Sequence, residues 1–267
     1  MPTRDEPIDI AVGEGHIAGT VVTPAARIPG VLFVHGWGGS QEQYLARARE
    51  IASLGCICLA FDLRGHAGTQ VQHETVSRES NLRDVLAAYD VLATHRLVDP
   101  SSIAVIGSSY GGYLAAILSS LRPVRWLALR VPALYRDDDW ELPKRQLHKE
   151  QNLHLYRQKF IHASDNRALR SCRAFEGDVL IVESEFDHVI PHTVISSYLE
   201  ACISAKSLTY RVIKEADHGL TEERNQRAYT ALLVNWMTEM VLGARSGNTQ
   251  AAMMPQSALS EAQPRPG

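Results

Sequence analysis

The sequence predicts an α/β fold with a mainly parallel, doubly wound sheet. Strand-like and helix-like segments alternate along most of the 267 residues, which is the pattern of a parallel sheet with helices on its faces. Two of the strand-like segments, residues 31–34 and 179–182, are apolar throughout, as strands covered on both faces require. Hydrophobic residues make up 45% of the chain and charged residues 21%, which is the composition of a globular protein with a substantial core.

The chain opens with two short strand-like segments, residues 8–12 and 16–23, and the glycine-containing turn between them predicts an antiparallel hairpin. Strands and helices alternate after it. In residues 80–94, for example, apolar side chains from Leu82 to Leu92 recur at helical spacing. Further strands are expected at residues 30–34, 56–61, 103–106, 125–131, 178–183 and 207–213, and further helices at 41–54, 111–121, 193–205 and 221–241.

Residues 132–176 interrupt this alternation and are too long for an ordinary loop between a helix and a strand. They predict a small helical cap inserted over the C-terminal edge of the sheet. We expect a single domain over residues 1–243 and a loosely ordered tail over residues 244–267, where apolar periodicity is absent. Substrate choice is expected to lie in the cap. Its aromatic and apolar side chains either bind an acyl or aryl group or dock the cap on the domain, and docking is the favoured interpretation. These side chains are Tyr135, Trp140, Leu153, Tyr156 and Phe160.

The charge balance argues against a nucleic acid or an anionic membrane as partner, because a net charge of −3 predicts no basic face. No segment approaches the roughly 18 consecutive apolar residues of a membrane span, and residues 1–7 lack the apolar stretch of a signal peptide. We therefore expect a cytoplasmic protein. The four cysteines, at positions 56, 58, 172 and 202, are too few and too scattered for a disulfide framework or a metal site. We expect Cys56, Cys58, Cys172 and Cys202 to be reduced and to serve in packing.

Residues 107–111, Gly-Ser-Ser-Tyr-Gly, stand between a strand-like run and a helix-like run. A strand that turns directly into a helix takes a sharp corner, and glycines on both sides remove the β-carbons that would collide there. Ser109 is then exposed above the sheet edge, and the N–H of Tyr110 lies at the helix N-terminus, where it can hold a developing oxyanion. The context predicts that Ser109 is a nucleophile rather than an ordinary loop serine.

A serine hydroxyl needs a histidine to take its proton and an acid to orient that histidine. His218 follows the last expected strand and precedes the last helix, and Asp187 follows the strand at residues 178–183. The chain order of serine, aspartate and histidine is the one found in α/β-hydrolases. Glu183 and Glu185 remain alternatives for the acid, although Asp187 is favoured because it lies after the strand.

A second oxyanion donor is expected from residues 35–39, His-Gly-Trp-Gly-Gly, which follow the first parallel strand. Glycines let the backbone approach a substrate closely, so the N–H of Trp37 can join that of Tyr110 in holding the tetrahedral intermediate. His35 is expected to brace this loop with its ring. Residues 62–66, Asp-Leu-Arg-Gly-His, are expected to form a turn that packs beside the loop.

With these motifs in place, the chain resembles the α/β-hydrolase superfamily from about residue 8 to residue 242. Within it the chain is similar to small serine esterases related to feruloyl esterases, dienelactone hydrolases and the catalytic domains of prolyl oligopeptidase-type enzymes. The resemblance implies an α/β-hydrolase fold and hydrolysis of carboxylic esters or related acyl compounds without a metal or organic cofactor. It departs from the dienelactone hydrolases, whose nucleophile is a cysteine where this chain has Ser109.

The expected function is therefore serine hydrolysis of a small-molecule ester, with Ser109, Asp187 and His218 as the catalytic triad and Trp37 and Tyr110 as the oxyanion hole. An amidase or peptidase of the prolyl oligopeptidase type uses the same machinery, and a non-catalytic ligand-binding member of the fold is the alternative outside catalysis. A homodimer is possible. The acidic run at residues 137–139 is interpreted as a solvated cap surface or a helix N-terminus rather than a cation site.

Overall fold

A computed structural model describes residues 3–12, 15–24, 27–147 and 151–253. The chain divides into two compact units. One consists of residues 28–237 and contains the large sheet, and the other consists of residues 1–27 together with residues 238–267.

The larger unit is built on six parallel strands in the order β4-β3-β5-β6-β7-β8. The mainly parallel, doubly wound sheet predicted from the sequence is confirmed, and its strands lie within a few residues of their expected positions. Strand β5 is longer than expected because its polar first half still pairs with β3. The strands are β3 (Ile28–Val34), β4 (Ile57–Ala60), β5 (Val98–Ser108), β6 (Trp126–Arg130), β7 (Asp178–Ser184) and β8 (Ser207–Ile213).

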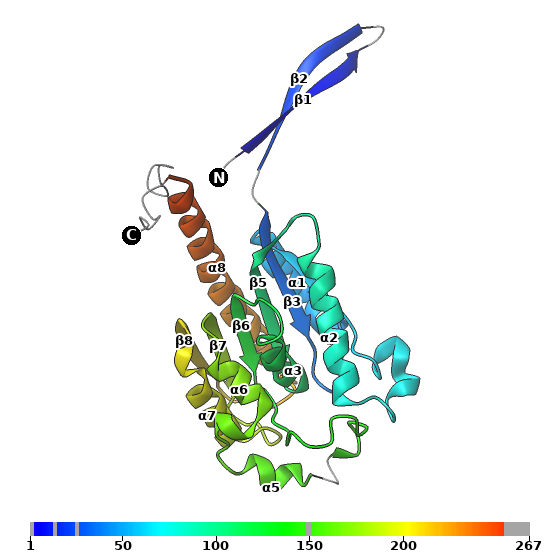
Figure 1. Ribbon diagram of the computed structural model, residues 1–267, viewed down its shortest axis with the longest axis vertical. Helices are drawn as coiled ribbons and strands as arrows, with labels where there is room; N and C mark the ends of the chain where they lie inside the picture. The colour runs from blue at the N-terminus through cyan, green and yellow to red at the C-terminus, as the bar shows by residue number, and fades with distance from the viewer. Residues whose placement is uncertain (1–2, 13–14, 25–26, 148–150, 254–267) are drawn as a thin grey trace, which may run out of the picture. The chain divides into compact units, whose positions relative to one another are not determined.

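Helices cover both faces of this sheet, as its apolar strands require. Figure 1 shows α2, α3, α6 and α7 on the near face, and α1 with the first part of α8 on the far face. Short 3₁₀ turns η1 (Ala67–Gln72), η2 (Ala163–Asp165) and η3 (Cys202–Ser204) complete the connections. The helices are α1 (Glu42–Ser53), α2 (Arg78–Ala93), α3 (Tyr110–Leu118), α5 (Leu153–Arg157), α6 (Arg167–Arg173), α7 (His192–Ala201) and α8 (Glu223–Met253).

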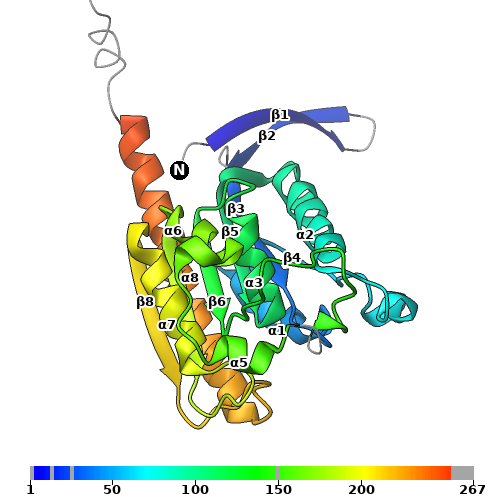
Figure 2. The same ribbon diagram turned by 60° about the horizontal axis from the view of Figure 1, so that its bottom comes forward.

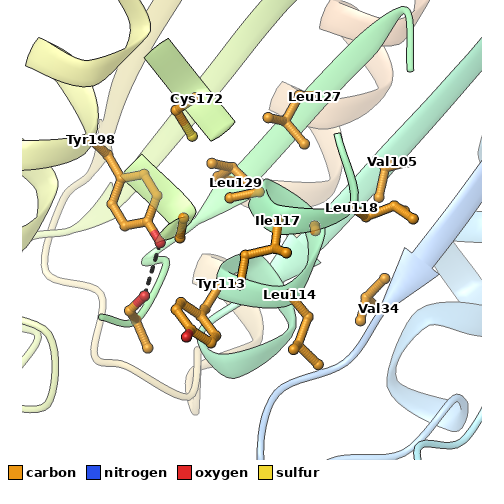
Figure 3. Packing of buried hydrophobic residues seen from close by; sticks show 14 of the residues in the cluster. Val34, Val105, Tyr113, Leu114, Ile117, Leu118, Leu127, Leu129, Cys172 and Tyr198 are labelled. Atoms are coloured by element: carbon orange, nitrogen blue, oxygen red, sulfur yellow. Dashed lines mark hydrogen bonds between the residues drawn. The ribbon is translucent and has the colours of Figure 1, made fainter. Parts of the chain in front are cut away.

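Helix α3 forms the centre of the core, because every one of its nine residues is buried. Figure 3 shows its side chains between Val34 and Val105 on one side and Leu127 and Leu129 on the other. The hydroxyl of Tyr198 donates a hydrogen bond of 2.9 Å to the Ala133 carbonyl in the same region. This packing fixes α3, and with it the strand-to-helix corner that precedes it.

The segment between β6 and β7 contains α5, η2 and α6. Helix α5 lies beyond the carboxyl ends of the strands, as both views show (Figure 1, Figure 2). Helix α6 packs against α3 and α7. The helical insertion expected after β6 is therefore present at the edge of the sheet where the strands end.

The smaller unit contains the two-stranded antiparallel sheet of β1 (Thr3–Val12) and β2 (Gly15–Pro24). This confirms the predicted hairpin, which shares no strand pairing with the six-stranded sheet among the described residues. Helix α8 continues to Met253, beyond its expected end at residue 241. No proline interrupts this stretch before Pro255, and the helix therefore passes through Gly243 and Gly247 although glycine is a poor helix former. The rest of the expected tail lies outside the described residues.

Among the described residues, no helix has the length and apolar character needed to span a membrane. None of the four cysteines forms a disulfide bond: Cys56, Cys172 and Cys202 are buried and Cys58 is half-buried.

Candidate active site

Ser109 occupies the corner between β5 and α3 with φ +52° and ψ −117°. A β-carbon built on Gly107 would lie 2.5 Å from the carbonyl oxygen of Gly111, and one built on Gly111 would clash with the Val34 carbonyl. Only glycine therefore fits at these two positions. The Ser109 N–H donates to the Arg130 carbonyl at 2.9 Å, so the neighbouring strand helps to hold the strained corner.

The structure brings the three expected side chains together at the carboxyl edge of the sheet. The Ser109 hydroxyl lies 3.0 Å from Nε2 of His218. Nδ1 of the same ring lies 2.7 Å from Oδ2 of Asp187. The imidazole can thus donate a hydrogen bond from Nδ1–H to the carboxylate and take the serine proton at Nε2. General-base activation requires this arrangement.

Asp187 is itself held in place, because its Oδ1 accepts hydrogen bonds of 2.8 Å from the N–H groups of Val189 and Ile190. Its side chain is 2% exposed, whereas that of His218 is 26% exposed. The carboxylate is therefore shielded while the imidazole remains open to a substrate.

The two alternative acids lie elsewhere. Glu183 interacts with Nδ1 of His192, the first residue of α7, and accepts a hydrogen bond from the Tyr210 hydroxyl. Glu185 pairs with Lys214 at 2.8 Å. Neither of them is a partner of His218.

The loop after β3 lies directly beside the serine. A β-carbon on Gly36 would be 3.4 Å from Cβ of Ser109, so the residue that follows it, Trp37, is close to the nucleophile. Trp37 and Ser109 line one cavity. Tyr110 is the first residue of α3, and N–H groups at that position have no acceptor within their helix. Trp37 and Tyr110 thus both lie close to Ser109, and their role as oxyanion donors stays a prediction.

His35 braces this loop as expected. Its Nδ1 donates to the Gly36 carbonyl at 2.8 Å, and its Nε2 accepts from the N–H of Leu63 at 3.0 Å. This pattern requires a neutral ring, and burial lowers the pKa of His35 in agreement with it. The Leu63 contact also confirms that residues 62–66 form a turn beside the loop.

The indole of Trp37 is enclosed by aromatic and charged side chains. His66 meets it edge-on at 4.8 Å between ring centroids, and His73 lies at 4.6 Å. The ammonium group of Lys144 lies 4.5 Å from the indole centroid and 5.1 Å from that of Tyr110. Lys144 is 1% exposed, and burial lowers its pKa. The insertion thus contributes a buried cation–π contact to the residue expected to supply one oxyanion donor.

Arg130, at the end of β6, connects the segments that carry the three site residues. Its guanidinium donates to the Ser108 hydroxyl at 3.3 Å, the Ser184 hydroxyl at 3.4 Å and the His218 carbonyl at 2.9 Å. The residue is 7% exposed. Sequence reasoning did not select Arg130, although a charged residue that ends an otherwise apolar strand was a usable signal.

A cavity of about 290 Å³ opens beside Ser109 and His218. It lies between the loop after β3, helix α1 and the first turns of α8. No residue of the 132–176 insertion is among the described residues that line it, so this cavity does not lie in the cap, where the sequence placed substrate choice. The physical reason is that the cap's apolar side chains are used in packing. The residues that line the cavity beside Ser109 are Gly36, Trp37, Gly38, Gly39, Gln43, Tyr44, Arg47, Ser108, Ser109, Arg130, His218, Gly219, Leu220, Gln226 and Tyr229.

The aromatic and apolar cap residues dock the insertion, which was the favoured interpretation. Tyr135 and Leu153 belong to the buried core, and Trp140 and Tyr156 pack against it, whereas Phe160 is 43% exposed.

In the acidic run at residues 137–139, Asp137 contacts the start of helix α6 within the insertion. Oδ1 of Asp137 accepts from the N–H of Arg167 at the start of α6, and its Oδ2 pairs with Arg170 at 2.8 Å. The expectation of a helix N-terminus is confirmed for Asp137. Among the described residues, no group of three or more His, Cys, Asp or Glu side chains is arranged to hold a metal ion.

Three solved structures share the overall arrangement. Est1E from Butyrivibrio proteoclasticus, with ferulic acid bound, aligns with a TM-score of 0.62 and 17% identity over 81% of this chain and 90% of its own. A monoacylglycerol lipase from Paleococcus ferrophilus aligns with a TM-score of 0.61 and 15% identity over 90% and 100%. A dienelactone hydrolase from Anabaena variabilis aligns with a TM-score of 0.55 and 19% identity over 89% and 98%. At these identities the likeness concerns the fold.

The family comparison extends over most of the larger unit. Residues 41–243 match the prolyl oligopeptidase family, a span that includes the strand-to-helix corner at Ser109 and the loops of Asp187 and His218. The sheet order, the site geometry and this match agree, and the chain belongs to the prolyl oligopeptidase family of α/β-hydrolases.

Proposed function

We propose that this protein is a serine hydrolase that cleaves carboxylic esters of small molecules through an acyl-enzyme. The observation that carries the proposal is the continuous hydrogen-bonded chain from the Ser109 hydroxyl through His218 to the buried carboxylate of Asp187. That chain opens into a cavity that a substrate can enter. A strained serine corner with a base and an acid in this order is an arrangement suited to acyl transfer.

In the proposed reaction, His218 takes the proton of Ser109 as the hydroxyl attacks the ester carbonyl carbon. The carbonyl oxygen becomes an oxyanion, which the N–H groups of Trp37 and Tyr110 stabilise. His218 then gives its proton to the leaving alcohol, and the acyl group remains on Ser109. A water molecule, deprotonated by His218, then attacks the acyl-enzyme, and His218 returns that proton to the Ser109 oxygen as the acid leaves. Asp187 stabilises the imidazolium that forms in each half-reaction.

A second candidate is an amidase or peptidase, and the family match favours it. The same residues carry out both reactions, but the leaving group of an amide is an amine that His218 must protonate before it departs. Turnover of an ester and an amide that share one acyl group, such as the 4-nitrophenyl ester and the 4-nitroanilide of acetic acid, separates the two functions.

The substitution Ser109→Ala tests the proposal. It is expected to lower kcat/KM for 4-nitrophenyl butyrate by roughly 10⁴-fold or more, because the nucleophile is lost while the fold remains. Ser53→Ala, which removes an exposed hydroxyl on α1, serves as the matched control and is expected to retain full turnover.

A fluorophosphonate probe provides the second measurement. It is expected to label the wild-type protein at Ser109 and to leave Ser109→Ala unlabelled. Near-wild-type turnover by Ser109→Ala would show that the nucleophile is assigned wrongly. A folded wild-type protein that resists the probe and hydrolyses neither ester nor amide would instead favour a ligand-binding member of the fold.

A further inference from the structure

The cavity beside Ser109 is lined by two guanidinium groups, those of Arg47 and Arg130. Among the described residues that line it, none is an aspartate or glutamate. The carboxylate of Asp217, next to His218 in the chain, accepts hydrogen bonds from the N–H and the hydroxyl of Thr221 and is not part of the lining. Asp217 interacts electrostatically with Arg130, so it offsets part of the charge at the cavity. The two guanidinium groups exceed this one carboxylate, and the net positive potential attracts an anion.

The direct hydrogen bonds of Arg130 go to neutral groups, and the carboxylate of Asp217 offsets its charge only in part. Its hydrogen-bond acceptors are two serine hydroxyls and one backbone carbonyl, all of them neutral, and it forms no ion pair within the described part of the chain. Its guanidinium also lies 5.6 Å from the ring centroid of Tyr229, which lines the cavity. Arg130 therefore supplies a fixed positive charge to the cavity wall, while each of its three side-chain nitrogens already donates one hydrogen bond.

Arg47, on α1, has a donor to spare. Its Nε donates to the Thr230 hydroxyl at 3.0 Å and its Nη1 to the Gln43 carbonyl at 2.8 Å. Its guanidinium lies 5.0 Å from the ring centroid of Tyr229 and 5.9 Å from that of Tyr44, so its position is constrained. Within the described residues, Nη2 donates no hydrogen bond and Arg47 forms no ion pair. Arg47 is only half-buried, and therefore accessible to a bound molecule.

Arg47 also lines a second pocket, whose lining includes Glu50 and Glu223. Glu223 pairs there with Arg227. Glu50 and Glu223 thus line that second pocket and are not among the residues that line the cavity beside Ser109.

From this arrangement we infer that the substrate carries a carboxylate, which binds to Arg47 in the cavity beside Ser109. The inference deepens the proposed function and rests on it: the ester is one whose acyl or alcohol part bears a negative charge. The cavity volume of about 290 Å³ lies at the lower end of the roughly 300–1,000 Å³ of ligand pockets, so the charged part is short. Guanidinium groups suit carboxylates because their planar donors can form charge-assisted hydrogen bonds.

The experiment compares esters that differ only in charge. Monoethyl succinate carries a carboxylate on its acyl part, and ethyl succinamate has an uncharged amide of the same size in its place. The wild-type protein is expected to prefer the charged ester by about tenfold or more in kcat/KM, the equivalent of about 1.4 kcal/mol. The glycolate ester of butyric acid, compared with ethyl butyrate, places the carboxylate on the alcohol part. A preference within either pair supports the inference and identifies the part that Arg47 binds, whereas equal turnover within both pairs overturns it.

Substitutions on helix α1 then test the role of Arg47. Arg47→Gln is expected to abolish the ratio between charged and neutral esters, and Arg47→Lys to restore part of it. Arg49→Gln removes an identical charge from the exposed face of α1 and is expected to keep the wild-type ratio. A charged-ester preference that survives in Arg47→Gln would overturn the assignment of the carboxylate to Arg47.

Binding of succinate to the Ser109→Ala protein, measured by calorimetry, separates this inference from the proposed function. Binding that is lost when Arg47→Gln is added supports the carboxylate site even if no ester is hydrolysed. Hydrolysis of neutral esters without any succinate binding or charged-ester preference supports the proposed function and overturns the carboxylate site.

Discussion

At the scale of single residues, the site depends on a serine whose backbone is strained. A non-glycine residue with φ +52° and ψ −117° costs on the order of 1–3 kcal/mol, which the surrounding structure must supply. The Ser109 carbonyl accepts hydrogen bonds from the N–H groups of Tyr113 and Ala133, and its own N–H donates to Arg130. These three bonds hold the hydroxyl above the sheet edge, where His218 meets it.

Arg130 is a positioning residue at this scale, because it donates to the backbone carbonyl of His218 and to the strand ends that precede Ser109 and Asp187. Arg130→Met is expected to lower kcat for 4-nitrophenyl butyrate by about tenfold with little change in KM, since the imidazole is less well held in the transition state. Arg130→Lys keeps one donor and is expected to recover part of kcat.

The exposed Arg211→Met serves as the control for removing an arginine. Equal turnover by Arg130→Met and the wild type would contradict the positioning role. A loss that Arg130→Lys does not relieve, and that follows the loss of folded protein in urea, would indicate a purely structural role.

At the scale of elements, the insertion is held by its own helix caps and by contacts to the domain. Asn166 is fully buried and caps α6, since its Oδ1 accepts from the N–H groups of Ala168 and Leu169. Its Nδ2 donates to the Tyr135 carbonyl at 2.7 Å and to the Tyr156 hydroxyl at 3.2 Å. One side chain therefore fastens the start of α6 to the first part of the insertion.

Asn166→Ala is expected to lower the free energy of unfolding by about 1–3 kcal/mol, because the cap is lost and the buried Tyr135 carbonyl loses its donor. Asn166→Ser keeps an oxygen that can cap α6 and is expected to fall between the wild type and Asn166→Ala. Urea unfolding followed by circular dichroism measures both. If Asn166→Ala unfolds at the wild-type urea concentration, Asn166 does not fasten the insertion.

At the scale of the whole molecule, buried histidines link stability to pH. Burial is the main cause that lowers the pKa of both His35 and His66 below the ordinary value of 6.5. Below that value the unfolded chain binds protons that the folded chain does not, so acid favours unfolding. The free energy of unfolding is therefore not reduced by these two rings above pH 6.5. It decreases as the pH falls from 6.5 toward their folded-state pKa values.

The free energy of unfolding is therefore expected to decrease as the pH falls below about 6.5, with a slope that is smaller in His66→Phe. Phenylalanine retains an aromatic ring beside Trp37 and cannot be protonated. Urea unfolding at several pH values between roughly 5 and 8 measures the two slopes. Identical slopes in the wild type and His66→Phe would show that His66 contributes nothing to the acid sensitivity.

The order of strands and helices, the serine corner and the positions of Asp187 and His218 could be predicted from the sequence alone. The physical reason is that these features are local: apolar runs of strand length, glycines at a sharp corner, and polar residues directly after strands. Parallel strands all end at one edge of their sheet, so residues that follow different strands are brought together by the topology itself.

The tertiary structure decided what depends on packing between distant elements. Arg130 meets the His218 loop across 88 positions of sequence, and Arg47 meets Thr230 across 183, so no local pattern identifies either contact. The sequence predicted that substrate choice lies in the insertion and that its aromatic residues mainly dock it, and Tyr135 and Leu153 do belong to the buried core. The cavity beside Ser109 instead opens between α1 and α8, because that is where the packed side chains leave space.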